Sequence, residues 1–256
     1  MSIRPRASTT AEPHTTGMKR IALVTGASRG LGATIARVLV RRDFDVILAA
    51  RTQSDLERTA ADLTPRNIVL TRHGDLADPF VRQTLIDAAR YLGGLDVLVN
   101  NASELGGIAP LAETALDRLE RLVAVNTLAP LALTQSALPL LVNRHGLVVN
   151  ISSDAASGAY AGWGAYGASK AALDLISRTL ATELAPARVG VVSVDPGDLR
   201  TRMHQEAFAG EDISDRPLPE VTEPFWNWLL DQDPMAVTGS RFKAQTAREQ
   251  WVVPVC

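Results

Sequence analysis

Two residues whose types and spacing suit proton transfer are Tyr166 and Lys170, four positions apart. The apolar positions that follow them recur at helical intervals, so we expect both side chains on one face of one helix. An ammonium group beside a phenol favours the phenolate, which predicts a pKa for Tyr166 below its ordinary value of about 10. The pair would then serve as a general acid or base. The alternative is an ordinary helix in which this common spacing has no function.

Ser153 adds a hydroxyl group to this pair. It follows the apolar strand pattern Leu147–Ile151 and precedes the helix that carries Tyr166. Open α/β sheets collect their ligand groups at the carboxyl ends of strands, where this serine is expected. The other tyrosines, Tyr91 and Tyr160, have no lysine four residues later. The sequence therefore singles out Tyr166 as the candidate acid or base.

A glycine-rich turn lies near the start of the chain. The apolar run Ile21–Thr25 leads into Thr-Gly-Ala-Ser-Arg-Gly-Leu-Gly, which ends at Gly32, and a helical pattern follows. This order predicts a phosphate cradle, because glycine allows close backbone approach and a helix N-terminus offers free N–H groups. The spacing differs from the commonest dinucleotide fingerprint, Gly-x-Gly-x-x-Gly. A structural turn without a ligand is the alternative.

The residues after the next strand pattern, Asp45–Ala50, bear on the choice between the two nicotinamide dinucleotides. NAD-binding folds usually carry an acid there for the ribose 2′-hydroxyl. This chain has Arg51 and Thr52 instead. Arg51 and Arg29 of the glycine turn could clamp a 2′-phosphate, so the sequence predicts NADP(H) as cofactor. Two solvated surface arginines are the alternative.

Six strand patterns alternate with helical patterns along the chain. Most are continuous apolar runs, which is typical of parallel strands covered on both faces. Repeated strand–helix units predict an α/β fold, a single doubly wound parallel sheet of Rossmann-like type with helices on both faces. Residues 19–256 would form this one domain. Besides the three strand patterns given above, the others are Ile68–Thr71, Asp96–Asn100 and Val189–Val194.

A long leucine-rich helix is expected between the fourth and fifth strands, from about residue 116 to 141, and Asn126 falls within it. A residue in such a place is more often a structural amide than a catalytic one. Pro130 should kink the helix, because its ring clashes with the carbonyl of Asn126 and its missing N–H leaves that carbonyl unpaired. The freed oxygen could hold a water.

Residues 202–224 lose apolar periodicity and gather prolines and acids. A long irregular segment beside a binding crevice is often a lid, so we expect a substrate loop there. A plain surface excursion is the alternative. The residues from Phe225 to Leu230 then predict a short amphipathic helix that packs against the core.

Composition and charge exclude several kinds of partner. The formal net charge is −2 and no basic tract occurs, so neither nucleic acid nor an anionic membrane is expected as a partner. No apolar run approaches the roughly 20 residues of a membrane helix, and no metal-ligand spacing occurs. The single cysteine, Cys256, ends the chain, so no internal disulfide is expected and a cytoplasmic location fits best. Residues 1–18 are expected to form a disordered tail.

Together these motifs resemble those of the short-chain dehydrogenase/reductase family, from Lys19 to about Ala244. The resemblance is specific because several motifs agree in order and spacing. They are Thr25–Gly32, Asp75 after the third strand, Asn100-Asn101-Ala102, Asn126, Ser153, Tyr166 with Lys170, and Pro196-Gly197.

The resemblance implies an oxidoreductase that interconverts a ketone or aldehyde and an alcohol, with a catalytic tetrad of Asn126, Ser153, Tyr166 and Lys170. Tyr166 would exchange a proton with the substrate oxygen, which Ser153 would hold by a hydrogen bond. Lys170 would bind the nicotinamide ribose and lower the Tyr166 pKa, and Asn126 would anchor a water that leads protons to Lys170. The implied cofactor-binding residues are Gly26, Ser28, Arg29, Gly30, Leu31, Gly32, Arg51, Asp75, Leu76, Asn100, Tyr166, Lys170, Pro196, Gly197, Leu199 and Thr201.

Three positions need comment. Ser103 stands where the family motif usually has glycine, which predicts a tighter or shifted backbone there. Asp198 and Arg200 make the loop after Pro196-Gly197 unusually charged, which indicates either a polar substrate or a surface salt pair. A lone histidine in a flexible loop, such as His204, is more often solvated than bound to substrate.

The leading hypothesis is an NADPH-dependent carbonyl reductase, or the reverse alcohol dehydrogenase. An epimerase or dehydratase would use the same cofactor site without net change in nicotinamide absorbance. A catalytically silent NADP(H)-sensing protein is the third possibility, although such relatives commonly lose the tyrosine or lysine. The resemblance also implies a homodimer or homotetramer that pairs the helices of Asn126 and Tyr166. The sequence leaves open which small carbonyl or alcohol is the substrate.

Overall fold

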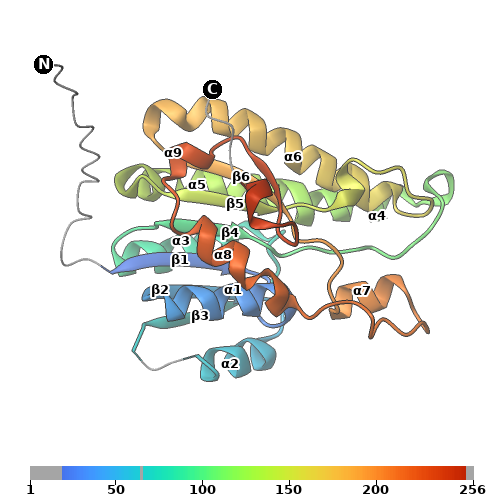
Figure 1. Ribbon diagram of the computed structural model, residues 1–256, viewed down its shortest axis with the longest axis horizontal. Helices are drawn as coiled ribbons and strands as arrows, with labels where there is room; N and C mark the ends of the chain where they lie inside the picture. The colour runs from blue at the N-terminus through green and yellow to red at the C-terminus, as the bar shows by residue number, and fades with distance from the viewer. Residues whose placement is uncertain (1–18, 64–65, 252–256) are drawn as a thin grey trace, which may run out of the picture.

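The computed structural model describes residues 19–63 and 66–251. Its centre is one parallel sheet of seven strands in the order β3-β2-β1-β4-β5-β6-β7 (Figure 1). The chain moves outward from β1 in one direction and then returns to place β4 on its other side. Ligands of such sheets bind beyond the strand carboxyl ends at this reversal. The predicted doubly wound α/β sheet is confirmed, while the predicted tail, residues 1–18, and Cys256 lie outside the described residues.

The strand boundaries follow the apolar patterns of the sequence to within two residues. The strands bury both faces because neighbouring side chains point alternately to two helical layers. The register aligns Leu23 of β1 with Ile47 of β2 and Leu98 of β4. The sequence pattern misses β7, because three residues are too few to show a period. The strands are β1 (Arg20–Thr25), β2 (Phe44–Ala50), β3 (Val69–His73), β4 (Val97–Asn100), β5 (Leu147–Ile151), β6 (Gly190–Asp195) and β7 (Arg241–Lys243).

Helices cover both faces of the sheet (Figure 1). One layer holds α1, α2 and α8, which pack on strand residues such as Val24. The other holds α3, α5 and α6, which pack on strand residues such as Leu23. The helices are α1 (Gly30–Arg41), α2 (Gln53–Ala61), α3 (Pro79–Leu92), α4 (Leu116–Val123), α5 (Ala129–Arg144), α6 (Gly164–Leu184), α7 (Arg202–Ala207), α8 (Glu223–Leu229) and α9 (Pro234–Val237). Shorter turns are η1 (Leu111–Glu113), η2 (Ala124–Leu128), η3 (Asp154–Ala156), η4 (Ala185–Ala187), η5 (Pro219–Thr222) and η6 (Arg248–Trp251).

The predicted long helix exists, but it changes its winding instead of simply kinking. The turn η2 between α4 and α5 is π-helical and contains Asn126. Pro130 lies in the first turn of α5, just after it. A single π-helical turn inside an α-helix is frequent at functional sites. The insertion therefore marks the surroundings of Asn126 as a place to search for chemistry.

The run from Leu116 to Arg144 is long and apolar enough to cross a membrane by length and composition alone. This differs from the expectation that no apolar run approaches membrane length. Half of its most apolar window is buried inside the molecule. Leu133 and Leu141 of α5 belong to the core between this helix and the sheet. Burial against the sheet accounts for the apolar composition of the run.

The segment 202–224 contains more regular structure than its sequence indicates. α7 begins directly after Thr201, whose side-chain oxygen accepts a hydrogen bond from the backbone N–H of His204 at 3.2 Å. This cap satisfies one of the free donors of the first turn. Turns and bends fill residues 208–218, and η5 follows. In Figure 1, α7 stands apart from both helical layers.

Candidate active site

Tyr166 and Lys170 lie in the first two turns of α6, and both are buried. The Lys170 ammonium donates a hydrogen bond to the backbone carbonyl of Ile151, the last residue of β5, at 2.8 Å. Its Nζ lies 5.7 Å from the centre of the Tyr166 ring. Ser153 follows two residues after Ile151. The carboxyl end of β5 and the start of α6 therefore bring the three predicted residues to one place.

The Tyr166 phenol behaves differently from the sequence prediction. Burial raises its pKa to about 12, since the phenolate would lose the solvation of water. Hydrogen bonds from Ser103 and Ser153 oppose that rise, while the more distant carboxylates of Asp154 and Asp195 add to it. The predicted lowering of the pKa is thus wrong, because desolvation outweighs the neighbouring groups.

Burial acts on Lys170 as well. It lowers the pKa of the ammonium to about 8, and the negative charge of Asp174, one turn later on α6, opposes this. The Asp174 carboxylate in turn accepts a hydrogen bond from Nε of Arg241 on β7 at 2.9 Å. The same guanidinium donates to the backbone carbonyl of Ser153 at 2.7 Å. Arg241 thereby links α6 to the backbone of the candidate catalytic serine, and the short strand that carries it gave no sequence signal.

Ser153 is held in an extended conformation at the start of η3. Its hydroxyl oxygen accepts a hydrogen bond from the N–H of Ala155 at 3.2 Å, and its O–H donates to the Asp154 carboxylate at 3.1 Å. The hydroxyl also reaches Tyr166, as its influence on the phenol pKa shows. A substrate oxygen could therefore meet both hydroxyls.

Asn126 is fully buried and makes four side-chain hydrogen bonds. Its amide oxygen accepts from the N–H of Glu104 at 2.8 Å and from the Ser103 hydroxyl at 3.1 Å. Its amide nitrogen donates to the Glu104 carbonyl at 2.8 Å and to the Ser169 hydroxyl at 3.0 Å. The residue thus clamps the loop after β4 to α6. Ser103 bridges Asn126 and Tyr166 with its hydroxyl, a contact that glycine could not make.

The glycine turn has the geometry of a phosphate cradle. Gly26 and Gly30 have positive φ angles of +66° and +53°. A Cβ on Gly32 would stand 2.3 Å from the Gly26 carbonyl oxygen, so only glycine lets α1 approach this closely. Arg29, which precedes α1, makes no side-chain capping hydrogen bond to the helix. The first N–H groups of α1 are therefore available to an anionic phosphate, as a dinucleotide requires.

Asn101 supports this turn from the neighbouring strand. Its amide nitrogen donates to the carbonyls of Thr25 and Gly26 at 2.9 and 3.2 Å. Asn100, which we expected at the adenosine side of the site, is instead buried in the sheet and donates to Asn150 at 2.8 Å. It does not line the cavity, because consecutive residues of a strand point to opposite faces. The neighbouring residue of the same motif is the one that faces the site.

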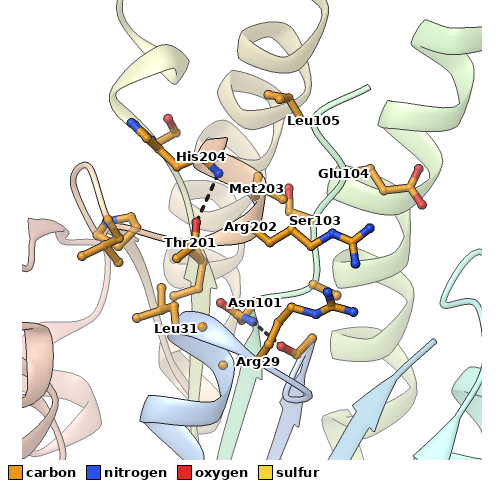
Figure 2. A pocket seen from close by; sticks show the side chains of 18 of the residues that line it. Arg29, Leu31, Asn101, Ser103, Glu104, Leu105, Thr201, Arg202, Met203 and His204 are labelled. Carbon is orange, nitrogen blue, oxygen red and sulfur yellow. Dashed lines mark hydrogen bonds between the residues drawn. The ribbon is translucent and has the colours of Figure 1, made fainter. Parts of the chain in front are cut away.

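A cavity of about 480 Å³ joins these groups, a size within the range of small-molecule sites. It runs along the carboxyl ends of the strands. Apart from Asn100 and the buried Asn126, all predicted site residues line it: Gly26, Ser28, Arg29, Gly30, Leu31, Gly32, Arg51, Asp75, Leu76, Ser153, Tyr166, Lys170, Pro196, Gly197, Leu199 and Thr201. Figure 2 shows three of its walls, formed by the glycine turn, the loop after β4 and the start of α7.

The end of the cavity near Tyr166 is lined by aromatic and apolar side chains. Trp163 packs edge-on against Tyr166, with ring centres 6.0 Å apart, and also contacts Phe208. Leu105 and Met203 belong to the same cluster. This wall combines three segments distant in sequence, so no local motif could have identified it.

His204 is not the solvated residue that the sequence suggests. Its ring lies near that of Phe208, with centres 4.8 Å apart, and it is among the residues that line the cavity.

The two charged residues of the loop after Pro196-Gly197 make different contacts. Asp198 forms an ion pair with Arg216 at 3.8 Å, whereas the backbone N–H of Arg200 donates a hydrogen bond to the carbonyl of Pro217. One of the two charged residues of this loop, Asp198, is thus part of a surface ion pair. Among the described residues, no cluster of three or more metal-ligating side chains occurs.

Comparison with known proteins agrees with this geometry. A family model described as short chain dehydrogenase matches residues 20–212. The uncharacterized oxidoreductase YciK of Escherichia coli (strain K12) is 32% identical over 240 residues, which are 90% of this chain and 93% of that protein. Benzil reductase ((S)-benzoin forming) of Bacillus subtilis (strain 168) is 36% identical over 71% of this chain and 75% of its own. A solved short chain dehydrogenase of Shigella flexneri 2a, complexed with NADP, is similar with a TM-score of 0.82 and 32% identity, covering 90% of this chain and 98% of that one.

Proposed function

This chain belongs to the short-chain dehydrogenase family of oxidoreductases, whose members use nicotinamide cofactors on small molecules, and we propose that it is an NADP(H)-dependent carbonyl reductase. It would reduce a ketone or aldehyde to an alcohol, or catalyse the reverse reaction. The observation that carries the proposal is the placement of the Ser153 and Tyr166 hydroxyls in one cavity with the glycine turn. When bound, the nicotinamide would supply or accept the hydride at the reacting carbon.

The chain's own residues would handle the proton. The Ser153 hydroxyl donates a hydrogen bond to the carbonyl oxygen and orients it toward Tyr166. As hydride reaches carbon, the phenol gives its proton to that oxygen and becomes a phenolate, which is then reprotonated from solvent. With a pKa of about 12, the phenol carries its proton at neutral pH and is ready to act as an acid. Lys170 would hold the nicotinamide ribose from its buried position.

Asn126 has a positioning role in this scheme. Its side-chain hydrogen bonds go to the backbone of Glu104 and to the hydroxyls of Ser103 and Ser169, not to Tyr166 or Lys170. The proposed water path to Lys170 would pass beside this clamp. Loss of Asn126 would therefore disturb the loop that forms one wall of the cavity.

NADP(H) is supported by the residues that follow β2. Arg51 and Arg29 line the cavity, and no carboxylate follows β2 directly. The similar Shigella flexneri structure contains NADP. Calorimetric titration should give tighter binding of NADPH than of NADH, and Arg51→Ala should reduce that ratio about tenfold or more. An unchanged ratio in the variant would remove Arg51 from cofactor selection.

The aromatic wall supports a substrate with an apolar or aromatic group beside the carbonyl. Trp163, Leu105 and Met203 give this end of the cavity an apolar surface. The relative from Bacillus subtilis is named for benzil, a diketone with two aromatic rings. A panel of aryl ketones, aliphatic ketones, quinones and sugars, assayed by NADPH oxidation, should show preference for the aryl ketones. Equal or better rates with sugars would contradict this choice.

The decisive variant is Tyr166→Phe. It should lower turnover by roughly 10³-fold or more, because the general acid is lost, while the NADPH dissociation constant stays within a factor of about three. Tyr91→Phe is the matched control, since Tyr91 is exposed on α3 and should leave both quantities unchanged. Retained turnover in Tyr166→Phe would end the proposed mechanism.

The assembly and location are proposals of the same kind. A homodimer or homotetramer is expected from the family resemblance, and exposed apolar residues such as Leu116, Leu128 and Leu175 on α4, η2 and α6 support it. Light scattering at micromolar concentration would measure the mass; a monomer of 27.4 kDa would contradict it. A cytoplasmic location is consistent with the single cysteine.

A further inference from the structure

A network of two arginines and two carboxylates joins three residues that line the cavity, Arg51, Asp75 and Glu104, to Arg121 on α4. The Glu104 carboxylate accepts a hydrogen bond from Arg51 at 2.6 Å and two from Arg121, at 2.6 and 2.9 Å. Arg121 also pairs with Asp75 at 2.7 Å. Burial alone would raise the pKa of Asp75, but hydrogen bonds from Arg121 and the Ala77 N–H hold it below its ordinary value. The four charged groups balance one another.

The strand order shows which part of the cavity this network occupies. Arg51 follows β2 and Asp75 follows β3, on one side of β1 and its glycine turn. Ser153 follows β5 on the other side, toward the catalytic residues. Glu104 belongs to the loop after β4, yet its side chain reaches across β1 to Arg51. The carboxylate therefore lies at the side of the turn opposite to the catalytic hydroxyls, where the adenosine half of a dinucleotide would lie.

Glu104 is held by more contacts than Arg51, and it is less exposed. Asn126 holds both the N–H and the carbonyl of Glu104 at 2.8 Å, and the bidentate pair with Arg121 fixes its carboxylate. Its side chain is only 18% exposed, while that of Arg51 is 66% exposed. A 2′-phosphate that approaches Arg51 would therefore meet a guanidinium already shared with an immobile negative charge. A 2′-hydroxyl would meet no such repulsion and could donate to the same carboxylate.

We propose that Glu104 is a specificity-determining residue that weakens the preference of this chain for NADP(H) over NAD(H). The inference rests on the proposed function, because it concerns the same cofactor site. Glu104 competes with the 2′-phosphate for Arg51 and repels it directly. Both effects disfavour the phosphate, whereas a 2′-hydroxyl could donate a hydrogen bond to the same carboxylate. In its position across the sheet, Glu104 takes the place of the acid that other chains carry after the second strand.

The test measures binding and not turnover. Calorimetry with NADPH and NADH should show that Glu104→Gln raises the ratio of NADPH to NADH affinity about tenfold, mostly through tighter NADPH binding. Glu120→Gln is the matched control, because Glu120 is an exposed carboxylate on α4 with the same charge. It should change the ratio less than twofold. An unchanged or lowered ratio in Glu104→Gln would overturn the inference.

A second pair of variants guards against a general disturbance of the loop. In an Arg51→Gln background, Glu104→Gln should no longer raise the ratio more than about threefold, because the shared guanidinium is absent. A full tenfold rise in that background would show that the effect does not pass through Arg51 and would overturn the competition. If the wild-type chain binds neither dinucleotide, the proposed function and this inference fall together. Binding of both with an unchanged ratio in Glu104→Gln removes this inference alone.

Discussion

The two ends of the cavity use charge in opposite ways. At the end with the candidate catalytic residues, burial raises the pKa of Tyr166 to about 12 and lowers the pKa of Lys170 to about 8, which favours the neutral form of each. At the adenosine end, Arg51 and Asp75 are partly exposed and paired with opposite charges. Buried groups of this kind tune proton transfer, whereas partly exposed pairs can be exchanged for the charges of a ligand. The comparison predicts large effects of substitution at the first end and small effects on stability at the second.

The largest effect on stability is expected for Asn126→Ala. The substitution leaves the N–H and carbonyl of Glu104 without partners in a partly buried place, and the Ser169 hydroxyl keeps only its bond to the Tyr166 carbonyl. The free energy of unfolding should therefore fall by about 3 kcal/mol. Urea denaturation would measure it. Asn67→Ala is the control, because Asn67 is not buried and makes one hydrogen bond, and it should cost less than about 0.5 kcal/mol. An equal loss in the free energy of unfolding for Asn126→Ala and Asn67→Ala would contradict the role of Asn126 in holding the loop after β4 to α6.

Lys170→Met tests the buried amine through pH. The pKa of Lys170 is about 8 in the folded chain, and its ordinary value is 10.5, so the unfolded chain binds more protons between these two pH values. The stability of the wild type should therefore rise with pH across this window, by about 3 kcal/mol relative to Lys170→Met. Below pH 8 this gain in the free energy of unfolding is absent, because Lys170 is protonated in both the folded and the unfolded chain. Urea denaturation of both proteins at pH 7 and pH 10 would measure the change. If the difference in the free energy of unfolding between the two proteins were the same at both pH values, the contrast between the two ends of the cavity would fail.

Ser103→Ala should have a smaller effect at the same end. Its hydroxyl lowers the pKa of the Tyr166 phenol, so its removal should shift the acidic limb of the pH profile for alcohol oxidation upward, by up to about one unit. Ser157→Ala removes a hydroxyl that bonds only to the Asp154 carbonyl and serves as control. Ser103→Thr should restore the wild-type profile if the hydroxyl is what matters. An equal shift of the pH profile in Ser157→Ala would contradict the effect of the Ser103 hydroxyl on the Tyr166 pKa.

The smallest effect on stability is expected for Asp75→Asn at the adenosine end. Asp75 and Arg121 are each about two-fifths exposed, and pairs of this kind contribute little. The free energy of unfolding should change by less than about 1 kcal/mol at neutral pH. Thermal and urea unfolding would check this. A loss as large as that of Asn126→Ala would show that the charge network is part of the folding core and would erase the contrast between the two ends.

Several features of the site could be predicted from the sequence because they depend on short-range geometry. Tyr166 and Lys170 share a helix face through their spacing alone. The turn ending at Gly32 has backbone requirements that only glycine meets. Continuous apolar runs indicated six of the seven strands and hence the doubly wound sheet. Each of these signals involves residues within a few positions of one another.

Other features depend on contacts between distant segments, which no local pattern encodes. The direction of the Tyr166 pKa shift was mispredicted, since spacing shows a nearby lysine but not the depth of burial that raises the pKa. Asn100 was assigned to the site in place of Asn101, because the sequence does not show which residue after β4 faces the cavity. Arg241 entered the site only when the strands were ordered in space.

The sequence by itself determined the kind of fold, the position of the glycine-rich turn and the identities of the groups that could move a proton. The tertiary structure decided how strongly those groups hold their protons and which charges face Arg51. The physical reason is that desolvation and ion pairing depend on distance through space, while helical and strand periodicity depend on distance along the chain.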